Sequence, residues 1–500
     1  MQSKRTKNGS KGFLSKISTS PLFIGIATGL YPLAFYYSRN FGMINSWEQF
    51  CYFLMLFLVA PILFFLVLKW LSKLSFLGKW GKYILPFFNL FLFFFFIKTI
   101  LYTDIERKII LGIFIVSVLL AYFLHKHFKK WLAVQLVLAF IGIIGLVPII
   151  WKYVNYSTEW MQQPDDIETI IFQKKPNIYY IQPDGYVNFS ELKRGYYNSE
   201  SSNFKDFLAQ NNFKNYPNFR SNYDATLSSN SSAFTMKHHY YSGGSNSGEI
   251  TNARNIIIND NAVLNIFKSN DYKTYFFTEF PYLMMNRPEM GYDYSNFDYS
   301  EIPFFGTGLE TKKNIITDFK LVLEKNDTDR PKFFFIEVFN PKHIDGFREG
   351  KNLALKKRNQ YFENVEKADK TIKEMVQNIL KNDPDALILI MADHGGYVGM
   401  TQMQQGNEKT SDRNKIFSIF SSMLSIHWPN GQEPEFNYKF KTSVNVFRII
   451  FSYLGEDTTY LNNLQEDISY GYITEKAPKG VYALIDEDDS ITFKAVNIKK

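Results

Sequence analysis

Ala386-Leu-Ile-Leu-Ile-Met-Ala392 is an apolar run that leads directly into Asp393-His394-Gly395. Such a run predicts a buried strand of an open α/β sheet, and it delivers the residues after it to the carboxyl edge, where these sheets keep their binding sites. A carboxylate and an imidazole at that edge are suitable ligands for a zinc-type cation. Taken alone, Asp-His-Gly is more often a turn or a helix cap, so a metal site needs further support.

A second strand with the same kind of ending lies far upstream. Residues 176–183 read Pro-Asn-Ile-Tyr-Tyr-Ile-Gln-Pro, and Asp184-Gly185 closes this run. Because the carboxyl ends of parallel strands meet at one edge, we expect Asp184 to lie near Asp393 and His394. Two strands that present acidic metal ligands at one edge indicate a metal-dependent phosphoryl or sulfuryl enzyme.

Helical and strand patterns alternate around these two strands. We expect helices at about 203–211, from near 226, at 261–269, 311–324, 353–381 and 443–454, and strands at 272–280, 332–339 and 416–426. Residues 480–497 are typical of a terminal β-hairpin that turns at 486–489. This alternation predicts an α/β domain with a mostly parallel central sheet between helices.

The first part of the chain has a different composition. Five apolar runs are long enough, or nearly so, to cross a bilayer of about 30 Å. They are Pro21 to Tyr37, Phe50 to Leu68, Tyr83 to Leu101, Ile109 to Leu124 and Trp131 to Ile150. Five such runs in succession predict a transmembrane anchor rather than buried core helices. The predicted parts are a basic segment 1–20, an anchor 21–151, a linker 152–175 and a catalytic domain 176–500.

Charges in the loops orient this anchor. Lysine and arginine concentrate in the N-terminal segment, between the second and third runs (Lys69, Lys73, Lys79, Lys82) and between the fourth and fifth, whereas the acids Glu48, Asp104 and Glu106 lie in the intervening loops. Basic loops stay cytoplasmic, so the N-terminus is predicted on the cytoplasmic side of the cell membrane and the catalytic domain on the outer side. The long first run without a small-residue cleavage site argues against a removable signal peptide.

The net charge of +8 is a property of the anchor. Residues 1–151 carry 16 Lys and Arg against 3 Asp and Glu, which leaves −5 for the other 349 residues. We therefore expect no nucleic-acid partner. The one cysteine, Cys51, lies in the second apolar run, so the exported domain has no disulfides or cysteine ligands and must be stabilised by a large core.

A hydroxyl-rich stretch lies between the two ligand-bearing strands. Residues 220–236 read Arg-Ser-Asn-Tyr-Asp-Ala-Thr-Leu-Ser-Ser-Asn-Ser-Ser-Ala-Phe-Thr-Met. In the simpler interpretation Thr226 is a helix N-cap. In the functional interpretation the same helix start binds phosphate oxygens and stabilises an alkoxide, so a metal-bound Thr226 becomes a nucleophile near neutral pH. Ser228 and Ser229 lie within a turn of helix and stay alternatives.

Other polar residues near this stretch have less specific roles. His238 and His239 are adjacent and cannot share one metal on a helix face, so we expect them on the surface. Arg220 and Asn222 either contact an anionic substrate or serve folding, and the sequence supports both equally.

Three motifs together resemble a known family. Phe339-Asn-Pro-Lys-His343 after a buried strand, Tyr361 to Ala368 followed by Asp369-Lys370, and Ala392-Asp-His-Gly395 look like the sulfatase-like branch of the alkaline phosphatase superfamily. With its five-run anchor the chain is similar to lipoteichoic acid synthases and lipid-A phosphoethanolamine transferases. The resemblance implies one divalent metal ion, Zn or Mn, and a phospho-threonine intermediate. It also implies transfer of a headgroup of the phosphoethanolamine or phosphoglycerol type from a membrane phospholipid to an envelope glycan or lipid.

Site residues follow from the resemblance by position. Asp184, Thr226, Asp393 and His394 would be the metal ligands and Thr226 the nucleophile. His343 stands where the family often keeps a substrate-contacting histidine, so it would bind phosphate or protonate a leaving alkoxide. A solvated loop position explains His343 equally well.

Departures from the family pattern define the alternatives. The transferases usually have Glu where this chain has Asp184, and Asp is usual in sulfatases and phosphatases. Residues 226–230 lack the Pro and Arg of the Cys/Ser-x-Pro-x-Arg motif, which disfavours sulfate-ester hydrolysis. No second cluster of His and Asp ligands is evident, which favours one metal. A phosphoester hydrolase would use the same residues, and an inactive membrane scaffold, the second alternative, would not need all four ligands.

Overall fold

The computed structural model of the 500-residue chain describes residues 20–71, 80–102, 106–199, 203–241, 250–325, 328–344 and 352–496. They form two compact units. One contains the chain up to Tyr156 together with Met285–Arg287 and Pro303–Thr307, and the other contains the rest from Ser157. The predicted basic segment, except Ser20, lies outside the described residues, as do Lys73, Lys79 and Asp104 of the loop-charge argument.

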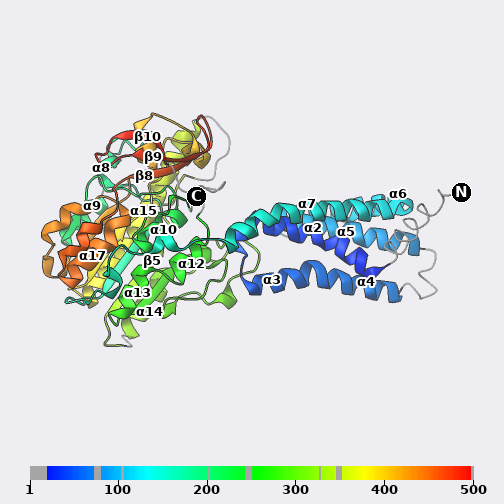
Figure 1. Cartoon of the computed structure of the whole chain (residues 1–500), viewed down its shortest axis with the longest axis horizontal. Helices are drawn as coiled ribbons and strands as arrows, with labels where there is room; N and C mark the ends of the chain where they lie inside the picture. Colours follow the sequence, from blue (N-terminus) through cyan, green and yellow to red (C-terminus); the bar gives the residue numbers. More distant parts are fainter. Residues whose placement is uncertain are drawn as a thin grey trace. The chain divides into compact units, whose positions relative to one another are not determined.

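The first unit is built from apolar helices (Figure 1, blue to cyan). They are α2 (Pro21–Asn40), the continuous stretch α3 (Trp47–Leu54), η2 (Met55–Val59) and α4 (Ala60–Leu71), then α5 (Gly81–Leu101), α6 (Arg107–Leu124) and α7 (Phe128–Val154). Each predicted apolar run lies within one of these helical stretches, and α2 packs against α4, α5 and α7. By length and composition, three stretches of the described chain could cross a membrane: Trp47–Leu71, Gly81–Leu101 and Arg107–Met161, the last of which includes both α6 and α7.

In the described part of the chain, a seven-stranded sheet forms the centre of the second unit. In spatial order its strands are β2 (Phe213–Asn215), β7 (Leu424–His427), β6 (Leu387–Met391), β1 (Ile178–Pro183), β5 (Lys332–Val338), β3 (Lys273–Thr278) and β4 (Tyr294–Ser295). The pairs from β6 to β4 are parallel, and β7 and β2 add an antiparallel edge. The prediction of a mostly parallel α/β sheet is therefore confirmed.

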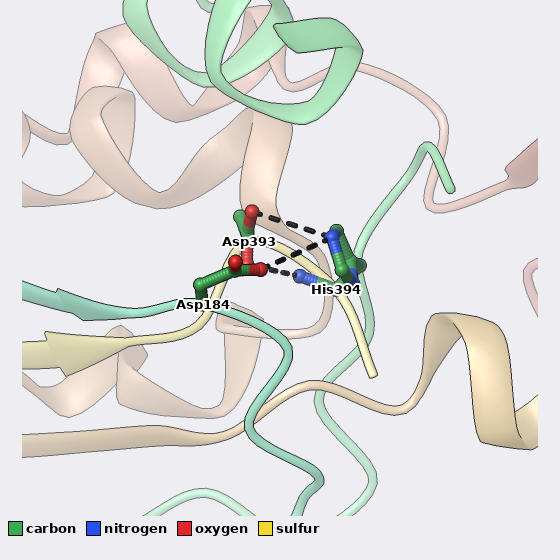
Figure 2. Close-up of side chains that lie close together, drawn as sticks. All are labelled: Asp184, Asp393 and His394. Atoms are coloured by element: carbon green, nitrogen blue, oxygen red, sulfur yellow. Dashed lines mark hydrogen bonds and ion pairs between the residues drawn. The ribbon is translucent and has the colours of Figure 1, made fainter. Parts of the chain in front are cut away.

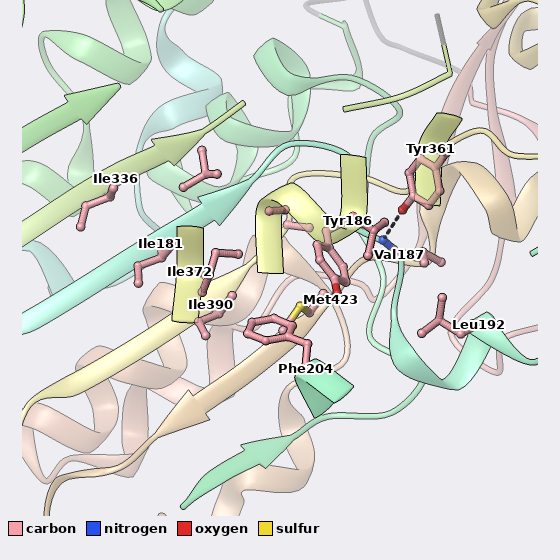
Figure 3. Packing of buried hydrophobic residues seen from close by; sticks show 14 of the residues in the cluster. Ile181, Tyr186, Val187, Leu192, Phe204, Ile336, Tyr361, Ile372, Ile390 and Met423 are labelled. Carbon is pink, nitrogen blue, oxygen red and sulfur yellow. Dashed lines mark hydrogen bonds between the residues drawn. The ribbon is translucent and has the colours of Figure 1, made fainter. Parts of the chain in front are cut away.

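Helices cover both faces of this sheet because side chains along each strand point alternately to opposite sides. Ile181, Ile336 and Ile390 pack into the main core with Ile372 of α15 (Leu353–Asn382), as Figure 3 shows. On the other face, Tyr180 contacts rings of α10 (Thr226–Thr235) and α17 (Val446–Gly455). The strands that lead to the predicted site are thus buried on both sides.

Shorter elements complete the second unit. Among the described residues, the remaining α-helices are α8 (Phe189–Leu192), α9 (Asn203–Gln210), α12 (Ala253–Ile258), α13 (Ala262–Ser269), α14 (Ile315–Lys325) and α16 (Arg413–Phe420). A separate antiparallel sheet consists of β8 (Ser469–Ile473), β9 (Gly480–Ile485) and β10 (Ile491–Ala495), and it contains the predicted hairpin.

The predicted strand at 416–426 is mostly wrong. Residues up to Phe420 belong to α16, and β7 begins only at Leu424. The carboxylate of Asp412 accepts hydrogen bonds from the backbone N–H groups of Asn414 and Lys415, which caps the helix at its start. The apolar residues of α16 are buried on several sides, so their spacing did not distinguish helix from strand.

Candidate metal centre

Three adjacent parallel strands end at the candidate site. Asp184 directly follows β1, Asp393 and His394 follow β6, and β5 leads into the segment with His343. The ligand atoms of Asp184, Asp393 and His394 all lie within 4.8 Å of one another. Figure 2 shows the three side chains converging from the two strand ends.

Two carboxylate oxygens at this point are buried without hydrogen-bond partners among the described residues. His394 Nε2 lies 3.5 Å from Asp184 Oδ1 and 3.5 Å from Asp393 Oδ2. Neither oxygen has a hydrogen-bond partner among the described residues. Because buried carboxylate oxygens are costly when unsatisfied, a divalent cation between them would be stabilising. Two carboxylates and one imidazole also suit a zinc-type ion, so these residues fit the predicted metal.

Hydrogen bonds orient each of these side chains. Asp393 Oδ1 accepts from the backbone N–H groups of Gly185 and His394, each at 3.0 Å, which leaves Oδ2 facing the site. His394 Nδ1 lies 2.8 Å from the carbonyl oxygen of Gly395. Donation from Nδ1 to this carbonyl leaves the Nε2 lone pair for a cation. The bond between Gly185 and Asp393 also ties the two ligand-bearing loops together.

The turn after β1 requires glycine. Gly185 has φ +67, and a Cβ there would lie 2.9 Å from the backbone carbon of Lys342 and 3.0 Å from the nitrogen of His343. The Gly185 carbonyl accepts a hydrogen bond from the Tyr361 hydroxyl at 3.0 Å. The same hydroxyl accepts from the N–H of Val187 (Figure 3). Tyr361, part of the family-like motif on α15, therefore holds the loop that carries Asp184.

Excess negative charge dominates the electrostatics of the cluster. Burial, and then the charge of Asp393, raise the pKa of Asp184 to about 7, and His394 and Lys342 offset part of this rise. Burial would lower the pKa of His394, but Asp393 and Asp184 outweigh it and raise that pKa above its ordinary value. Both shifts arise because two carboxylates share a small desolvated space, a condition that favours a cation.

Helix α10 begins beside this cluster. Thr226 is its first residue, and Ala225, with extended backbone, is the N-cap, so the N-cap interpretation of Thr226 is wrong by one residue. Thr226 is partly exposed and lines a pocket of ≈ 320 Å³ that Asp184 and His394 also line. His343 lines the same pocket, with its ring centroid 6.3 Å from that of His394.

The two alternative nucleophiles are engaged by the backbone. The Ser229 hydroxyl is buried and donates to the carbonyl of Tyr223 at 2.9 Å. The Ser228 hydroxyl donates to the carbonyl of Ala225 at 3.2 Å. Ser228 also lines the pocket, but Ser228 and Ser229 are each 1% exposed whereas Thr226 is partly exposed, which favours Thr226 over both.

A reciprocal amide pair fixes α10 on the sheet. Asn230, one helical turn after Thr226, accepts from Gln182 Nε2 at 2.5 Å and donates to Gln182 Oε1 at 3.0 Å. Both side chains are buried, and Gln182 lies two residues before Asp184 on β1. The pair therefore holds the start of α10 in register with the strand that ends at the site.

Two residues that line the pocket, Glu337 and Leu309, were not predicted from the sequence. Glu337, near the end of β5, lines the pocket together with Tyr282, Leu309 and Phe339. Burial raises the pKa of Glu337 to about 8, against a hydrogen bond from the Thr278 hydroxyl. The only signal in the sequence was a charged residue inside a run of Phe and Ile that otherwise reads as a core strand.

The surface position expected for His238 and His239 is wrong. Both are buried, and the His239 ring stacks on Tyr223 with centroids 3.9 Å apart. His239 Nε2 lies 2.9 Å from the carbonyl of Ser228, while Nδ1 accepts from the N–H of Tyr241 at 2.8 Å. The two histidines are therefore buried side chains, and His239 contacts the backbone of α10.

Arg220 serves folding rather than substrate binding. It is 1% exposed, and its guanidinium forms a salt bridge of 2.8 Å to Asp489 and donates to the Ser469 hydroxyl. It also donates to the carbonyls of Asp467 and Asp486. These contacts with the small C-terminal sheet and its turns fix the position of the segment that leads to Thr226. Asn222 is likewise buried and bonded to the backbone of this region.

Comparisons with known proteins complete the description of this site. The model of the sulfatase family matches residues 182–456. The C-terminal periplasmic domain of EcEptC from Escherichia coli has 15% identity and a TM-score of 0.43, covering 63% of this chain and 93% of that one. The lipoteichoic acid synthase LtaP from Listeria monocytogenes has 16% identity and a TM-score of 0.42, covering 65% and 91%. Lipooligosaccharide phosphoethanolamine transferase A from Neisseria meningitidis has 12% identity and a TM-score of 0.42, covering 87% and 95%. No curated protein matches the chain.

Proposed function

Because the chain belongs to the sulfatase family, whose model spans residues 182–456, we propose that it is a metal-dependent phosphotransferase. Its substrate is a membrane phospholipid, and its product is an envelope glycan or lipid that carries the phosphoryl-linked headgroup. Thr226 is the nucleophile, and Asp184, Thr226, Asp393 and His394 hold one divalent ion, Zn or Mn. A bound ion of this kind lowers the pKa of a coordinated hydroxyl and neutralises phosphoryl charge.

One observation carries this proposal. Two buried carboxylate oxygens that have no hydrogen-bond partner among the described residues lie 3.5 Å from His394 Nε2, and the pocket beside them contains the first residue of α10. The N-terminus of a helix favours phosphate oxygens and a developing alkoxide. A cation site and a hydroxyl at such a helix start are the parts that covalent phosphoryl transfer needs.

The proposed reaction has two balanced halves. Thr226 Oγ1 loses its proton and attacks the phosphorus. The bond from phosphorus to the lipid oxygen breaks, and diacylglycerol leaves after its oxygen has taken up one proton. A hydroxyl of the acceptor then attacks the phosphorus and loses its proton, and Thr226 leaves as the free hydroxyl. His343, which lines the pocket, is proposed to move the proton at the leaving oxygen or to bind phosphate.

The apolar helices support a membrane location. We propose the full arrangement of a cytoplasmic segment 1–20, a five-span anchor 21–151, a linker 152–175 and an extracytoplasmic catalytic domain 176–500. A catalytic domain tethered to the membrane meets lipid donors at high effective concentration.

Sulfate-ester hydrolysis is the less suitable reaction for this chain. Thr226 occupies the start of α10, where the sequence Thr-Leu-Ser-Ser-Asn contains no residue that could become formylglycine in a Cys/Ser-x-Pro-x-Arg context. Phosphoester hydrolysis differs from transfer only in using water as the acceptor, so the same test addresses both reactions.

Mass analysis of the purified full-length chain tests the proposal. After incubation with membrane phospholipids and Mn or Zn, we expect a headgroup adduct on the peptide that contains Thr226 and about one metal ion per chain. Thr226→Ala should abolish the adduct, whereas the matched variant Ser228→Ala should retain it. Asp393→Asn should lose the metal as well as the adduct.

Each other result has a defined meaning. An adduct that persists in Thr226→Ala would overturn the assignment of the nucleophile. A chain that binds metal but forms no adduct with any phospholipid would indicate a hydrolase with another substrate. A chain with neither metal nor adduct would support the inactive scaffold.

A further inference from the structure

The pocket beside Thr226 contains a carboxylate that the proposed mechanism does not use. Glu337 lines the pocket and is 6% exposed, yet it is outside the group of three residues whose ligand atoms converge. Within the described residues Glu337 forms no ion pair, since its one partner there is the Thr278 hydroxyl. A buried carboxylate without a cationic partner is costly, so a cation that enters this pocket would bind favourably.

A hydrogen bond orients the Glu337 carboxylate before any ligand binds. Thr278 lies opposite Glu337 in the register of β3 and β5, and its hydroxyl donates to Glu337 Oε2 at 2.7 Å. This bond fixes the orientation of the carboxylate and leaves its other oxygen for a ligand in the pocket.

The other walls of the pocket favour an organic cation that is joined to a phosphate. Tyr282 and Phe339 contribute aromatic rings that already attract cations, since Arg254 lies 4.6 Å from the Tyr282 ring centroid and Lys342 lies 5.7 Å from that of Phe339. Lys342 and His343 contribute groups that suit phosphate oxygens. A pocket of ≈ 320 Å³ with both kinds of wall is complementary to a small zwitterion rather than to a second metal ion.

We propose that Glu337 binds the ammonium group of the donor headgroup. The site then selects a zwitterionic phosphodiester with a terminal amine, of the ethanolamine type, over an anionic phosphodiester of the glycerol type. This inference rests on the proposed function because it takes the ligand to be a phospholipid whose phosphorus reaches Thr226.

The test compares two donors on the full-length chain in mixed micelles. The rate of adduct formation on Thr226 is measured by intact mass with phosphatidylethanolamine and with phosphatidylglycerol. Glu337→Gln keeps the size of the side chain and an oxygen for Thr278 but removes the charge. We expect the rate with phosphatidylethanolamine to fall about 10- to 100-fold, while the rate with phosphatidylglycerol does not fall.

Glu279→Gln is the matched control. Glu279 follows β3, is also buried and does not line the pocket; its Oε2 accepts from the N–H of Phe339 and its Oε1 pairs with Lys312. We expect both donor rates to stay unchanged in this variant. The inference is overturned when the ratio of the two rates is the same in Glu337→Gln as in the wild type. An equal fall in both rates is one such result.

A binding measurement separates this inference from the proposed function. The full-length Thr226→Ala variant is titrated calorimetrically with O-phosphoethanolamine and with glycerol phosphate. Tighter binding of O-phosphoethanolamine that is lost on adding Glu337→Gln supports the role of Glu337, even when the wild type forms no adduct and the transferase proposal fails. Equal binding of the two phosphates overturns the role of Glu337 whatever the wild type does with lipids.

Discussion

Single residues in the candidate site are constrained by different physical effects. Asp393 has one oxygen fixed by two backbone N–H groups and one left facing the cluster, so its position depends on the backbone rather than on an ion. Thr226 depends on where a helix starts, and Glu337 depends on the register of β5 with β3. Asp393 was predictable because it directly follows an apolar run. Glu337 was not, because a sequence pattern does not tell which strand residue borders a pocket.

The buried histidines give stability a pH dependence. Burial, with some offset from the bond to Ser228, lowers the pKa of His239 to about 3, and burial lowers that of His238 to about 4. The unfolded chain binds protons on both below about pH 6.5, and the folded chain does not. Stability therefore falls with decreasing pH from about 6.5 to 4, by about 1.4 kcal/mol per pH unit for each histidine.

Thermal unfolding at about pH 7 and pH 5, with metal present, checks this expectation. His239→Asn keeps an acceptor for the N–H of Tyr241 but cannot titrate. The variant should be less stable than the wild type near neutrality, because it loses the stack on Tyr223, and its unfolding temperature should fall less at acidic pH. An equal fall in wild type and variant would contradict the assignment of His239 as a neutral buried group.

Among the secondary-structure elements, long apolar runs were predicted well and short elements poorly. The strands β1, β5 and β6 are buried on both faces, so their sequences are nearly continuous apolar runs of the kind that is typical of a parallel sheet. The strands β2 and β7 at the antiparallel edge have few residues and no clear alternation. Their placement depends on pairing with distant strands, which local pattern does not contain.

Helix α15 gives a prediction at this scale. Tyr361→Phe removes the hydroxyl that joins the carbonyl of Gly185 to the N–H of Val187, and both backbone groups would be left unsatisfied. We expect a loss of about 1–3 kcal/mol of stability, because unsatisfied buried groups are costly. Metal affinity should fall about tenfold, because the Gly185 N–H that orients Asp393 lies in the same turn.

Tyr186→Phe is the control for this change. It also removes a buried tyrosine hydroxyl, here one that donates to Asp369 of α15 at 2.7 Å, but it leaves the turn at Gly185 intact. Metal titration of the two variants should show weaker binding only for Tyr361→Phe. Equal affinities would contradict the role of α15 in holding the Asp184 loop.

At the scale of the whole molecule, the change in composition along the chain predicted one part made of apolar helices and a second part with an α/β fold. The helical nature of the five runs follows from apolar length, since backbone groups in a lipid interior must bond within the segment. Crossing of a bilayer depends on the charges of the loops as well as on hydropathy.

The predicted orientation can be tested with single cysteines. Cys51→Ser removes the one native cysteine, after which Tyr438→Cys, at a position that is 70% exposed, and Ser10→Cys report on the two sides. In cells with an intact cytoplasmic membrane, an impermeant maleimide should label Tyr438→Cys, whereas Ser10→Cys should react only after lysis. The reverse pattern would overturn the placement of the catalytic domain outside the membrane.

The contacts of Arg220 with the small C-terminal sheet can form only late in the translation of the chain. The ion-pair partner of Arg220, Asp489, is 269 residues further along the chain. All proposed metal ligands and Thr226 therefore leave the ribosome well before the partners that fix the approach to α10. Chains interrupted before the small C-terminal sheet would contain every proposed site residue yet lack the contacts that hold the nucleophile segment. We expect catalytic competence to arrive late in translation, after the ligand-bearing strands have already paired.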